Sequence, residues 1–404
     1  MAQNFPDTRA AAQAQLAAFL PQAGEDYARW RNHHDRDGMP TTSRLSPAIR
    51  RRLISEAEVC AAVTAHHGAE VAAKFIDEVC WRSYWVGWLQ GRPEIWQRWR
   101  DDVASLTATL ATDADLAARH AAALAGRTGI DCFDAWAAEL ATTGWLHNHA
   151  RMNFASIWVF TLGLPWQLGA ELFWRRLLDA CPASNTLSWR WVAGLHTPGK
   201  TYLADAETIR AMSGGRFALT APLATVATVP PDDGNPAPVM IAAPDRVDDD
   251  ARTGLLIMSS DYSLETLALP RLAAVAAPAT VSADLSPRRA AYGEAARADA
   301  LARAALRAGI APDRLDNDRL TEATRVWAAR HRLAQIVTAD APIGPIAARL
   351  DRLAPALAAD GVRLVRLRRA WDDLAWAHAD KGFFGFRKAI PALLALPVGA
   401  VSLS

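Results

Sequence analysis

The sequence is poor in cysteine, in net charge and in long apolar runs, and each scarcity excludes a class of protein. Four cysteines occur among 404 residues, without CxxC pairing or zinc-like spacing, which argues against a disulfide scaffold and for a reducing cytoplasm. We find no signal peptide and no apolar run long enough to cross a bilayer, so we expect no membrane partner. A formal charge of +1 excludes a generally polybasic nucleic-acid binder but allows a local basic face.

Tryptophan, in contrast, is abundant and unevenly placed. Of 16 tryptophans, 13 lie at or before residue 191. A chain of this length is long for one hydrophobic core, which favours two domains. We expect the aromatic first half to form one of them.

Residues 1–218 are predicted to form an all-helical domain. Apolar residues recur there at helical spacing, with glycine and proline between the runs. Helices this aromatic, with arginine and asparagine on the same turns, suit a bundle around a planar ligand with polar edges. The expected helices are Asp7–Leu20, Ser55–Thr64, Val71–Leu89, Cys132–Leu140, Asn148–Leu162 and Gly169–Ala180.

A proline-rich stretch and then an alternating pattern follow. Residues 219–250 combine six prolines with Asp, Gly and Thr, which disfavours regular structure and predicts a linker. Residues 251–404 alternate apolar runs with amphipathic segments, which predicts a smaller α/β domain with a parallel sheet. No GxGxxG or Walker motif marks a nucleotide site there. The expected strands are Leu255–Met258, Leu272–Ala277, Ile336–Thr338 and Leu364–Leu367, and the expected helices are Ala295–Gly309, Leu320–His331 and Ile346–Ala359.

Two polar segments near the start could carry chemistry. Residues 42–46, TSRLS, place small hydroxyls and an arginine before a predicted helix, where they could bind a phosphate or simply cap the helix. Glu78, Trp81, Arg82 and Trp85 share one helical face by their spacing of three and four residues. They could grip a base and a phosphate, or they could form a half-buried ion pair in a core.

Two more polar segments lie further along. Residues 144–152, GWLHNHARM, put Asn148 and Arg151 on a helix that must be partly buried, so each side chain needs a polar partner. The two histidines of this segment are two residues apart, which suits neither a helical metal site nor HExxH, and we interpret them as non-metal residues. Residues 179–191 place a carboxylate, an amide and a WxW pair in an irregular loop, which could line a flat heterocycle or serve a structural role.

In this order, TSRLS, ExxWR, GWxHNxxRM and DxxxxxNxxxWxW closely resemble the FAD domain of DNA photolyases and cryptochromes. Each motif is short, but the ordered set is specific. The resemblance covers residues 5–200, about half of the chain, and it implies a helical domain that binds FAD.

The resemblance also implies roles for single residues. Arg151 and Asp179 would pair beside the isoalloxazine, and Asn185 would face flavin N5, where plant cryptochromes typically carry Asp. The complete FAD-binding set would be Tyr27, Thr42, Ser43, Arg44, Leu45, Ser46, Arg82, Arg151, Asp179, Cys181 and Asn185.

A lesion pocket follows from the same resemblance. Asn148 and Met152 match the enzymes for cyclobutane dimers, because the (6-4) enzymes place His at both positions. Indole rings of the pocket would stack on a flipped pyrimidine dimer. The catalytic set would be Glu78, Trp81, Asn148, Met152 and Trp191, and DNA would be bound by Arg31, Trp81, Asn148 and Trp191, with Arg44 on phosphates.

The sequence departs from the family pattern at two places. Cys181 stands where the family usually has a second Asp, so a hydrogen bond to the flavin ring would be weakened or rerouted. Trp189 and Trp166 match the inner and middle members of the family's electron-transfer chain, but no Trp stands at the outer position. We expect Trp158 or Trp174 to substitute as the exit to solvent.

The domain order is also unusual. In the family, an α/β antenna domain precedes the FAD domain, whereas here the α/β pattern follows it. Residues 336–386 are similar to the later half of such an antenna domain, so we expect a permuted domain order. The alternative is an unrelated α/β domain. An antenna chromophore of unknown identity would be a second cofactor.

These observations lead to one functional prediction and two alternatives. We predict a monomeric cytoplasmic photolyase that repairs cyclobutane pyrimidine dimers in DNA by light-driven electron transfer from reduced FAD. The first alternative is a cryptochrome-like blue-light photoreceptor without repair activity, which the altered Cys181 and the missing outer Trp would suit. The second is an FAD-binding protein that performs unrelated chemistry in the dark.

Overall fold

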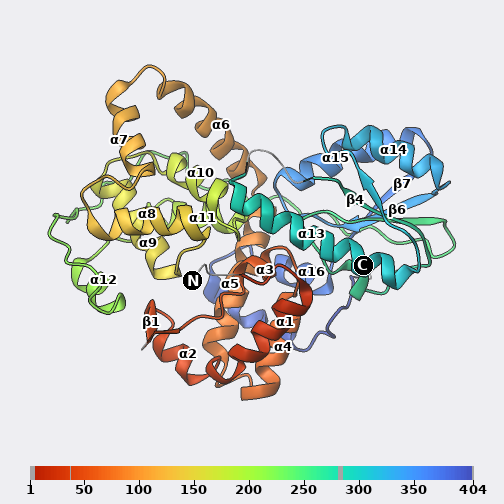
Figure 1. Cartoon of the computed structure of the whole chain (residues 1–404), viewed down its shortest axis with the longest axis horizontal. Coiled ribbons are helices and arrows are strands. Elements are labelled where there is room, and N and C mark those ends of the chain that lie inside the picture. The colour runs from red at the N-terminus through yellow and green to blue at the C-terminus, as the bar shows by residue number, and fades with distance from the viewer. Residues whose placement is uncertain (1–4, 37, 281–284, 403–404) are drawn as a thin grey trace. The chain divides into compact units, whose positions relative to one another are not determined.

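Figure 1 shows the computed structural model of the chain, in which residues 5–36, 38–280 and 285–402 are described. The chain divides into two compact units. The helical unit comprises Gln22–Ser43 and Arg92–Pro238, and the α/β unit comprises Phe5–Pro21, Arg44–Gly91 and Val239–Ser404. Each unit is assembled from separate stretches of the chain, so their limits differ from the predicted segments 1–218, 219–250 and 251–404.

The helical unit contains most of the tryptophan-rich half. A two-residue antiparallel strand pair, β1 (Asp35–Arg36) and β2 (Met39–Pro40), adds to its helices. The π-helical turn Ile157–Thr161 continues α9, as the expected helix 148–162 requires. The helices are α2 (Glu25–Trp30), α6 (Pro93–Thr109), α7 (Ala114–Leu124), α8 (Asp131–Thr143), α9 (Asn148–Ser156), α10 (Trp166–Arg176), α11 (Pro182–Val192) and α12 (Ala206–Met212).

Aromatic rings fill the core of this unit. Phe133 stacks on Phe154 with ring centroids 4.1 Å apart, and Trp158 and Trp189 meet edge to face at 6.2 Å. Gly169 makes this packing possible, because a Cβ there would lie 2.3 Å from the Trp189 ring. The surplus of tryptophan seen in the sequence is therefore largely core.

A cluster of buried imidazoles lies in the same unit. The His34 ring centroid is 5.0 Å from that of His147 and 6.0 Å from that of His149. Burial, together with the neighbouring histidines, lowers the pKa of His34 to about 4 and that of His147 to about 3. Burial and His33 lower the pKa of His149 to about 4. All three imidazoles are therefore neutral at pH 7.

The α/β unit is built on a five-stranded sheet. Its strands run parallel in the order β5-β4-β3-β6-β7, and α14 and α15 lie on one side of it with α13 on the other (Figure 1). The strands are β3 (Thr253–Leu256), β4 (Leu272–Pro278), β5 (Asp313–Leu315), β6 (Gln335–Ala339) and β7 (Arg363–Leu367), and the helices are α13 (Pro287–Ala308), α14 (Leu320–Arg330), α15 (Pro345–Ala359) and α16 (Ala370–Ala377).

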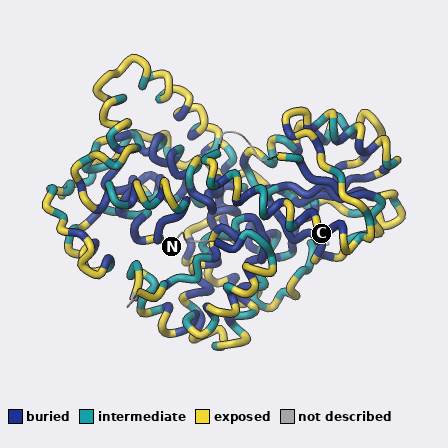
Figure 2. The backbone as a smooth tube through the Cα atoms, in the orientation of Figure 1, coloured by how far each residue is buried: buried dark blue, intermediate teal, exposed yellow. Residues whose placement is uncertain are grey.

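The predicted fold class, helices followed by a parallel α/β sheet, is confirmed. Four strands were predicted, and each has a central apolar stretch that is buried in the sheet (Figure 2). The missed strand, β5, has only three residues, Asp-Arg-Leu, and pairs on one side alone. So short and polar an edge strand has no periodic signal. The prediction also started α13 eight residues late, beyond its Ser286 cap and first-turn proline.

Helices from the start of the chain pack within the α/β unit. Ser83 on α5 accepts a hydrogen bond from Trp371 Nε1 at 2.9 Å. A Cβ at Gly87 would lie 2.7 Å from Ala379 Cβ, so α5 and the end of α16 approach closely. These N-terminal helices are α1 (Arg9–Phe19), α3 (Ser46–Arg50), α4 (Glu56–His67) and α5 (Ala73–Gln90). Two short helices near the end of the chain, α17 (Phe383–Phe386) and α18 (Ile390–Leu394), belong to the same unit, and single 3₁₀ turns occur at Leu20–Gln22, Leu264–Thr266 and Arg387–Ala389.

Residues 219–250 contain neither a helix nor a strand, yet both ends are held by side chains. In the helical unit, Arg190 pairs with Asp232, and its Nη2 donates to Asn235 Oδ1 at 3.1 Å. In the α/β unit, Arg368 donates to the Ala242 carbonyl at 2.8 Å. The boundary between the units falls between these contacts, at Pro238.

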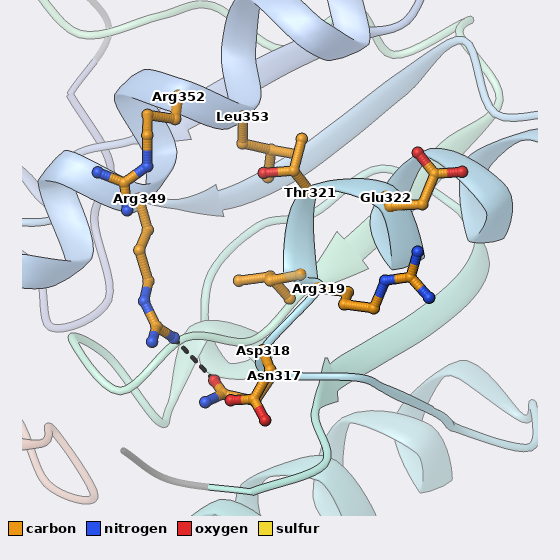
Figure 3. Close-up of a pocket in the computed structure, with 9 residues that line it drawn as sticks. Asn317, Asp318, Arg319, Thr321, Glu322, Arg349, Arg352 and Leu353 are labelled. Atoms are coloured by element: carbon orange, nitrogen blue, oxygen red, sulfur yellow. Dashed lines mark hydrogen bonds between the residues drawn. The ribbon is translucent and has the colours of Figure 1, made fainter. Parts of the chain in front are cut away.

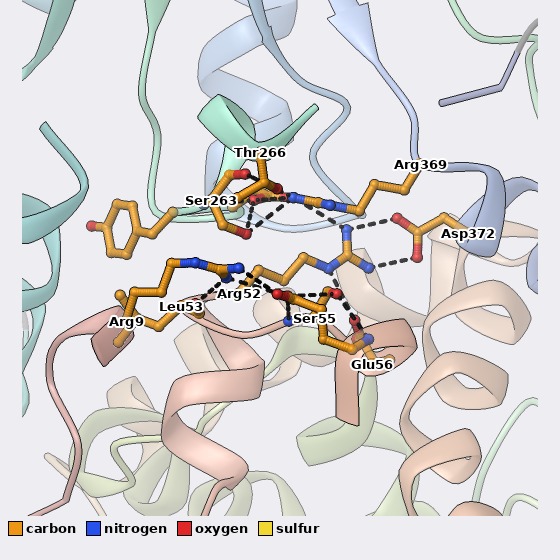
Figure 4. Close-up of polar contacts among 12 residues, drawn as sticks. Arg9, Arg52, Leu53, Ser55, Glu56, Ser263, Thr266, Arg369 and Asp372 are labelled. Atoms are coloured by element: carbon orange, nitrogen blue, oxygen red, sulfur yellow. Dashed lines mark hydrogen bonds and ion pairs between the residues drawn. The ribbon is translucent and has the colours of Figure 1, made fainter. Parts of the chain in front are cut away.

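A buried ion network joins the N-terminal helices to the C-terminal part of the α/β unit (Figure 4). The Arg52 guanidinium binds both oxygens of Asp372, at 2.7 and 2.5 Å, and its Nε donates to Glu56 at 3.1 Å. Asp261 lies 3.7 Å from Arg52 and receives two hydrogen bonds from Arg369, at 2.7 and 3.0 Å. These side chains are at most 8 % exposed, so each charge depends on its partners.

Two carboxylates of the network, those of Glu56 and Asp261, have lowered pKa values. Burial alone would raise the pKa of Glu56, but the charges of Arg52 and Arg82 outweigh it and lower the pKa to about 2. Burial opposes ionisation of Asp261 as well, and there too the attraction of Arg369 and Arg52 wins and the pKa falls below its ordinary value.

No helix within the described residues is long and apolar enough to span a bilayer.

Replacing Arg52 by Met should destabilise the protein by about 3–5 kcal/mol, because it leaves buried carboxylates without a counter-charge. The matched control is Arg325→Met, which removes an exposed ion pair with Asp360 and should leave the urea midpoint unchanged. Equilibrium urea unfolding measures both. Equal midpoints for the two variants would show that the network contributes nothing.

The imidazole cluster predicts a loss of stability in mild acid. Unfolded histidines take up protons near pH 6.5, whereas the folded His34, His147 and His149 do so only near pH 3–4. Between pH 6.5 and 4 the unfolded chain therefore binds more protons, and each such histidine lowers stability by up to about 1.4 kcal/mol per pH unit. Thermal unfolding of His34→Gln should depend less steeply on pH than that of the wild type over this window. Parallel curves would contradict this assignment.

Candidate functional site

The start of α9 carries three of the residues that the sequence singled out. His147 caps the helix, because its Nδ1 accepts a hydrogen bond from the His149 backbone N–H at 3.2 Å. Asn148 follows as an exposed first residue, and its amide reaches the Met152 sulfur one turn later at 3.7 Å. Asn148 and Met152 therefore lie side by side at the surface of the helical unit.

Arg151, on the same helix, forms an ion pair with Asp179. Its two terminal nitrogens donate to the two carboxylate oxygens at 3.1 and 2.8 Å, and its Nε donates to the Leu146 carbonyl at 2.8 Å. The Asp179 side chain is 6 % exposed, so the guanidinium supplies the counter-charge that this buried carboxylate needs. The sequence predicted these two side chains as a pair, and the structure brings them together.

Asn185 lies on α11 and is buried. Its Nδ2 donates to the Ala170 carbonyl at 2.8 Å, which fixes the amide plane. Among the described residues no donor reaches its Oδ1. An amide oxygen that accepts no hydrogen bond within the protein suits a ligand N–H donor, such as the N5–H of a reduced flavin.

Cys181 directly precedes α11. It is buried, and its side chain does not cap the helix. Its carbonyl accepts the Asn185 backbone N–H at 2.9 Å. A carboxylate at this position would bring a charge and two acceptors, whereas a neutral thiol is a weak hydrogen-bonding group.

The predicted electron-transfer tryptophans are both buried in the helical unit. Trp189 meets Trp158 and also Phe173, at 5.1 Å, whereas Trp166 lies under the Arg190 guanidinium at 6.0 Å. Trp158 in turn contacts the half-exposed His120 at 5.8 Å. Of the two substitute exits that the sequence suggested, Trp158 is the one in ring contact with Trp189.

Trp191 and Trp174 are partly buried. Trp191 stacks on Tyr202, with ring centroids 5.8 Å apart. Trp174 contacts Trp96 at 5.5 Å, in a group separate from Trp189. Sequence reasoning missed Tyr202, because no spacing pattern ties a residue after the WxW pair to that pair.

A pocket of about 300 Å³ in the helical unit lies next to the predicted phosphate-binding segment. It is lined by Tyr27, Trp30 and Thr41, among others. The chain then continues into Thr42 and Ser43. Tyr27 of the predicted FAD set therefore faces this pocket, whereas Arg31 on the next turn donates to the Ala28 carbonyl.

The TSRLS turn itself has an unusual backbone. Arg44 has a positive φ of 52°, and Leu45 is right-handed, with φ −82° and ψ −5°. Alternation of the two hands directs successive N–H groups to one side, the concave arrangement that binds phosphate groups. A non-glycine residue rarely adopts a positive φ, and such positions concentrate at functional sites. Ser46 then begins α3.

On α5 of the α/β unit lie Glu78, Trp81 and Arg82. Glu78 is exposed, and Arg82 Nε donates to Glu56 at 2.8 Å. Trp81 stacks face to face on Phe383, with ring centroids 3.8 Å apart and planes 8° apart. One face of Trp81 is therefore covered by an aromatic ring from the C-terminal region, which sequence reasoning did not anticipate because some 300 residues separate the two.

The α/β unit also has a pocket of about 400 Å³ where β5 ends and α14 begins (Figure 3). Arg319, Arg349 and Arg352 line it, and Arg349 donates to the buried Asn317 at 2.7 Å. Ligands of parallel sheets bind at the carboxyl ends of the strands. No residue of this pocket was predicted as a site. In the described part of the chain, no group of three or more His, Cys, Asp or Glu could hold a metal ion.

Comparison with known proteins identifies relatives for part of the chain. A family model described as the FAD binding domain of DNA photolyase matches residues 75–213. A deoxyribodipyrimidine photo-lyase of Streptomyces griseus is 33 % identical over 178 residues, which are 42 % of this chain and 36 % of that protein. The one of Thermus thermophilus is 34 % identical over 202 residues, 48 % of this chain and 44 % of that protein.

Further similarities extend to cryptochromes. Cryptochrome-1 of Arabidopsis thaliana is 45 % identical over 69 residues, 17 % of this chain and 10 % of that protein. Among solved structures, a class III photolyase from Agrobacterium tumefaciens covers 51 % of this chain and 43 % of its own, with 27 % identity and a TM-score of 0.42. A Synechocystis cryptochrome covers 52 % and 45 %, with 20 % identity and a TM-score of 0.39.

The chain spans less than half the length of the curated relatives named here. The matched stretch, residues 75–213, contains Glu78, Trp81, Asn148, Arg151 and Asn185. Over this stretch the chain is similar to the FAD-binding domains of DNA photolyases.

Proposed function

We propose that this protein is a photolyase that repairs cyclobutane pyrimidine dimers in DNA, using light and a bound, reduced FAD. The observation that carries the proposal is that the buried Asn185 and the Arg151–Asp179 pair both lie within a stretch that matches photolyase FAD-binding domains. When bound, reduced FAD excited by light would supply one electron to the dimer and take it back after the ring has split.

Different residues would bind different parts of the cofactor. The alternating backbone at Arg44 and Leu45 offers N–H groups to the diphosphate, and Tyr27, Thr42, Ser43, Ser46 and Arg82 add side-chain contacts. Asn185 offers an acceptor to the N–H donor of a reduced ring. Arg151 and Asp179 present a planar charged pair that fixes the ring edge, and Cys181 supplies no charge of its own.

Other residues would hold the lesion. Glu78 and Asn148 are exposed polar side chains able to hydrogen-bond the dimer and stabilise its added charge. Trp81 and Trp191 offer ring surface for stacking, with Met152 against Asn148. Arg31 and Arg44 would bind phosphates, so DNA affinity should fall with salt. In electron transfer, Trp189 and Trp166 would be joined by Trp158.

The domain organisation belongs to the same proposal. Residues 1–218 would be the FAD-binding domain, 219–250 the linker and 251–404 an antenna-like domain in permuted order. The five-stranded parallel sheet in the last of these segments is the feature that an antenna-like domain would have. The protein would act as a monomer in the cytoplasm, in keeping with its four free, buried cysteines.

A photoreceptor without repair activity is the second candidate. Two observations favour it: Cys181 stands at a usual Asp position, and Phe383 covers one face of Trp81. A purified protein that photoreduces its flavin but neither binds nor splits dimers would support this candidate against the first.

Repair itself can be tested with an oligonucleotide that carries one thymine dimer. Under blue light and reductant, the wild type should split the dimer, and Asn148→Ala should do so at least about tenfold more slowly, because a hydrogen bond to a charged group is lost. The control, Gln97→Ala, removes an exposed amide bound to Asp101 and should repair normally. Chromatography of the oligonucleotide measures the product. Wild-type protein that leaves the dimer intact would refute the proposal.

Flavin binding can be tested independently of repair. Arg151→Met should lower the ratio of FAD to purified protein by about tenfold or more, because Asp179 loses its partner at the flavin edge. Arg175→Met, which removes an exposed arginine paired with Glu171 on α10, should keep the flavin. Absorbance at the flavin band gives the ratio, and circular dichroism verifies that each variant is folded. Full flavin content in folded Arg151→Met would contradict the assigned role.

A further inference from the structure

One aromatic side chain of the protein is unusually exposed to solvent. Among the described residues, Phe384 is the single aromatic side chain in the exposed class, with 84 % of its surface accessible. Exposed apolar residues are common on protein surfaces. An exposed aromatic ring is nevertheless exceptional in this chain, whose other described rings are buried or half-buried, including all 16 tryptophans.

The exposure of Phe384 is imposed by its neighbours. Phe383, on one side, is 7 % exposed and stacks on Trp81, whereas Phe386, on the other, is fully buried and contacts Tyr84 at 5.7 Å. Arg387 extends the attachment to α5, because its Nε donates to Asp77 at 3.1 Å. Two buried rings and an ion pair therefore hold the segment, and Phe384 projects from it into solvent.

The surroundings of the ring are open and carry exposed basic side chains, with the exposed Asp380 beside Lys381. An added Cβ atom at Gly382 would meet nothing within 4 Å, and one at Gly385 would meet only Lys381 Cβ, at 3.6 Å, so the main chain on both sides of the phenylalanine pair is accessible. Lys381 and Lys388 are exposed at the two ends. In the parts of the chain that the structure describes, neither lysine forms an ion pair with a carboxylate.

We propose that Lys381–Lys388 is a DNA-contacting segment, in which Phe384 stacks on an unpaired base and the two lysines bind phosphates. The inference rests on the proposed function for its partner, DNA. Aromatic rings among basic side chains are the composition of surfaces that bind single-stranded nucleic acid, and a base flipped out of a duplex leaves unpaired neighbours. Through Phe383 the segment also fixes the ring plane of Trp81, which belongs to the proposed lesion pocket.

Charge and shape favour DNA over a protein partner. An apolar protein interface would need a patch of apolar side chains, because interface cores are depleted in charge. Here a single ring stands between two lysines and two bare glycines. A sugar–phosphate backbone can approach closely where glycines carry no side chain, and one exposed ring can stack on one unpaired base.

The test measures affinity for two fluorescein-labelled oligonucleotides, one single-stranded and undamaged, one duplex with a thymine dimer, by anisotropy with the flavin-loaded protein. Phe384→Ala should weaken binding by about tenfold, the usual loss for one stacked base, and Phe384→Tyr should restore it. Leu306→Ala is the control, because Leu306 is also 84 % exposed and lies on α13 of the same unit. It should bind like the wild type.

Salt dependence tests the lysines. Lys381→Gln with Lys388→Gln should flatten the plot of log affinity against log salt for the single strand by about 1.4, or 0.7 per phosphate contact. Flavin content and photoreduction should stay unchanged in every variant. If the wild type binds neither oligonucleotide, the proposed function fails. If the wild type binds and Phe384→Ala binds equally well, the proposed function stands and this inference is wrong.

Discussion

The α/β unit depends on one buried guanidinium. Arg52 stands between a carboxylate of the N-terminal helices, Glu56, and one of the C-terminal part, Asp372. It also has a positive φ of 51°, which costs a non-glycine residue free energy. Because an unpaired buried charge is far more costly than that strain, segments some 300 residues apart can form the network only together. A stretch that resembles an FAD domain thus shares its core with the sheet.

Local patterns in the sequence predicted the elements of the fold but not their assembly. Apolar runs predicted four of the strands, and helical periodicity predicted helices in segments where the structure has them. The interleaving of the two units has no such signal, because contacts between Ser83 and Trp371 or between Arg52 and Asp372 depend on neither spacing nor composition. The resemblance to a known family did not help either, since it assigns residues 5–200 to one domain, whereas the structure places Arg44–Gly91 in the α/β unit.

In the candidate site, too, some contacts could be predicted from the sequence and others could not. Arg151 and Asp179 could be predicted as partners because both belong to motifs of a known family, and each alone would be a buried charge in need of a counter-charge. Phe383 on Trp81 and Tyr202 on Trp191 could not be predicted, because stacking partners need only be flat and apolar. The imidazole cluster was likewise missed, since His34 is far in sequence from the two histidines of α9.

Two of these long-range contacts converge on α5. Arg82, expected near the flavin, donates to Glu56, whose second oxygen binds Arg52, and Trp81, expected at the lesion, stacks on Phe383. The residues that orient both side chains thus include groups from the C-terminal part of the chain. An appended light-harvesting domain would have no need of such contacts. The helices that follow the sheet therefore help to position the side chains of α5.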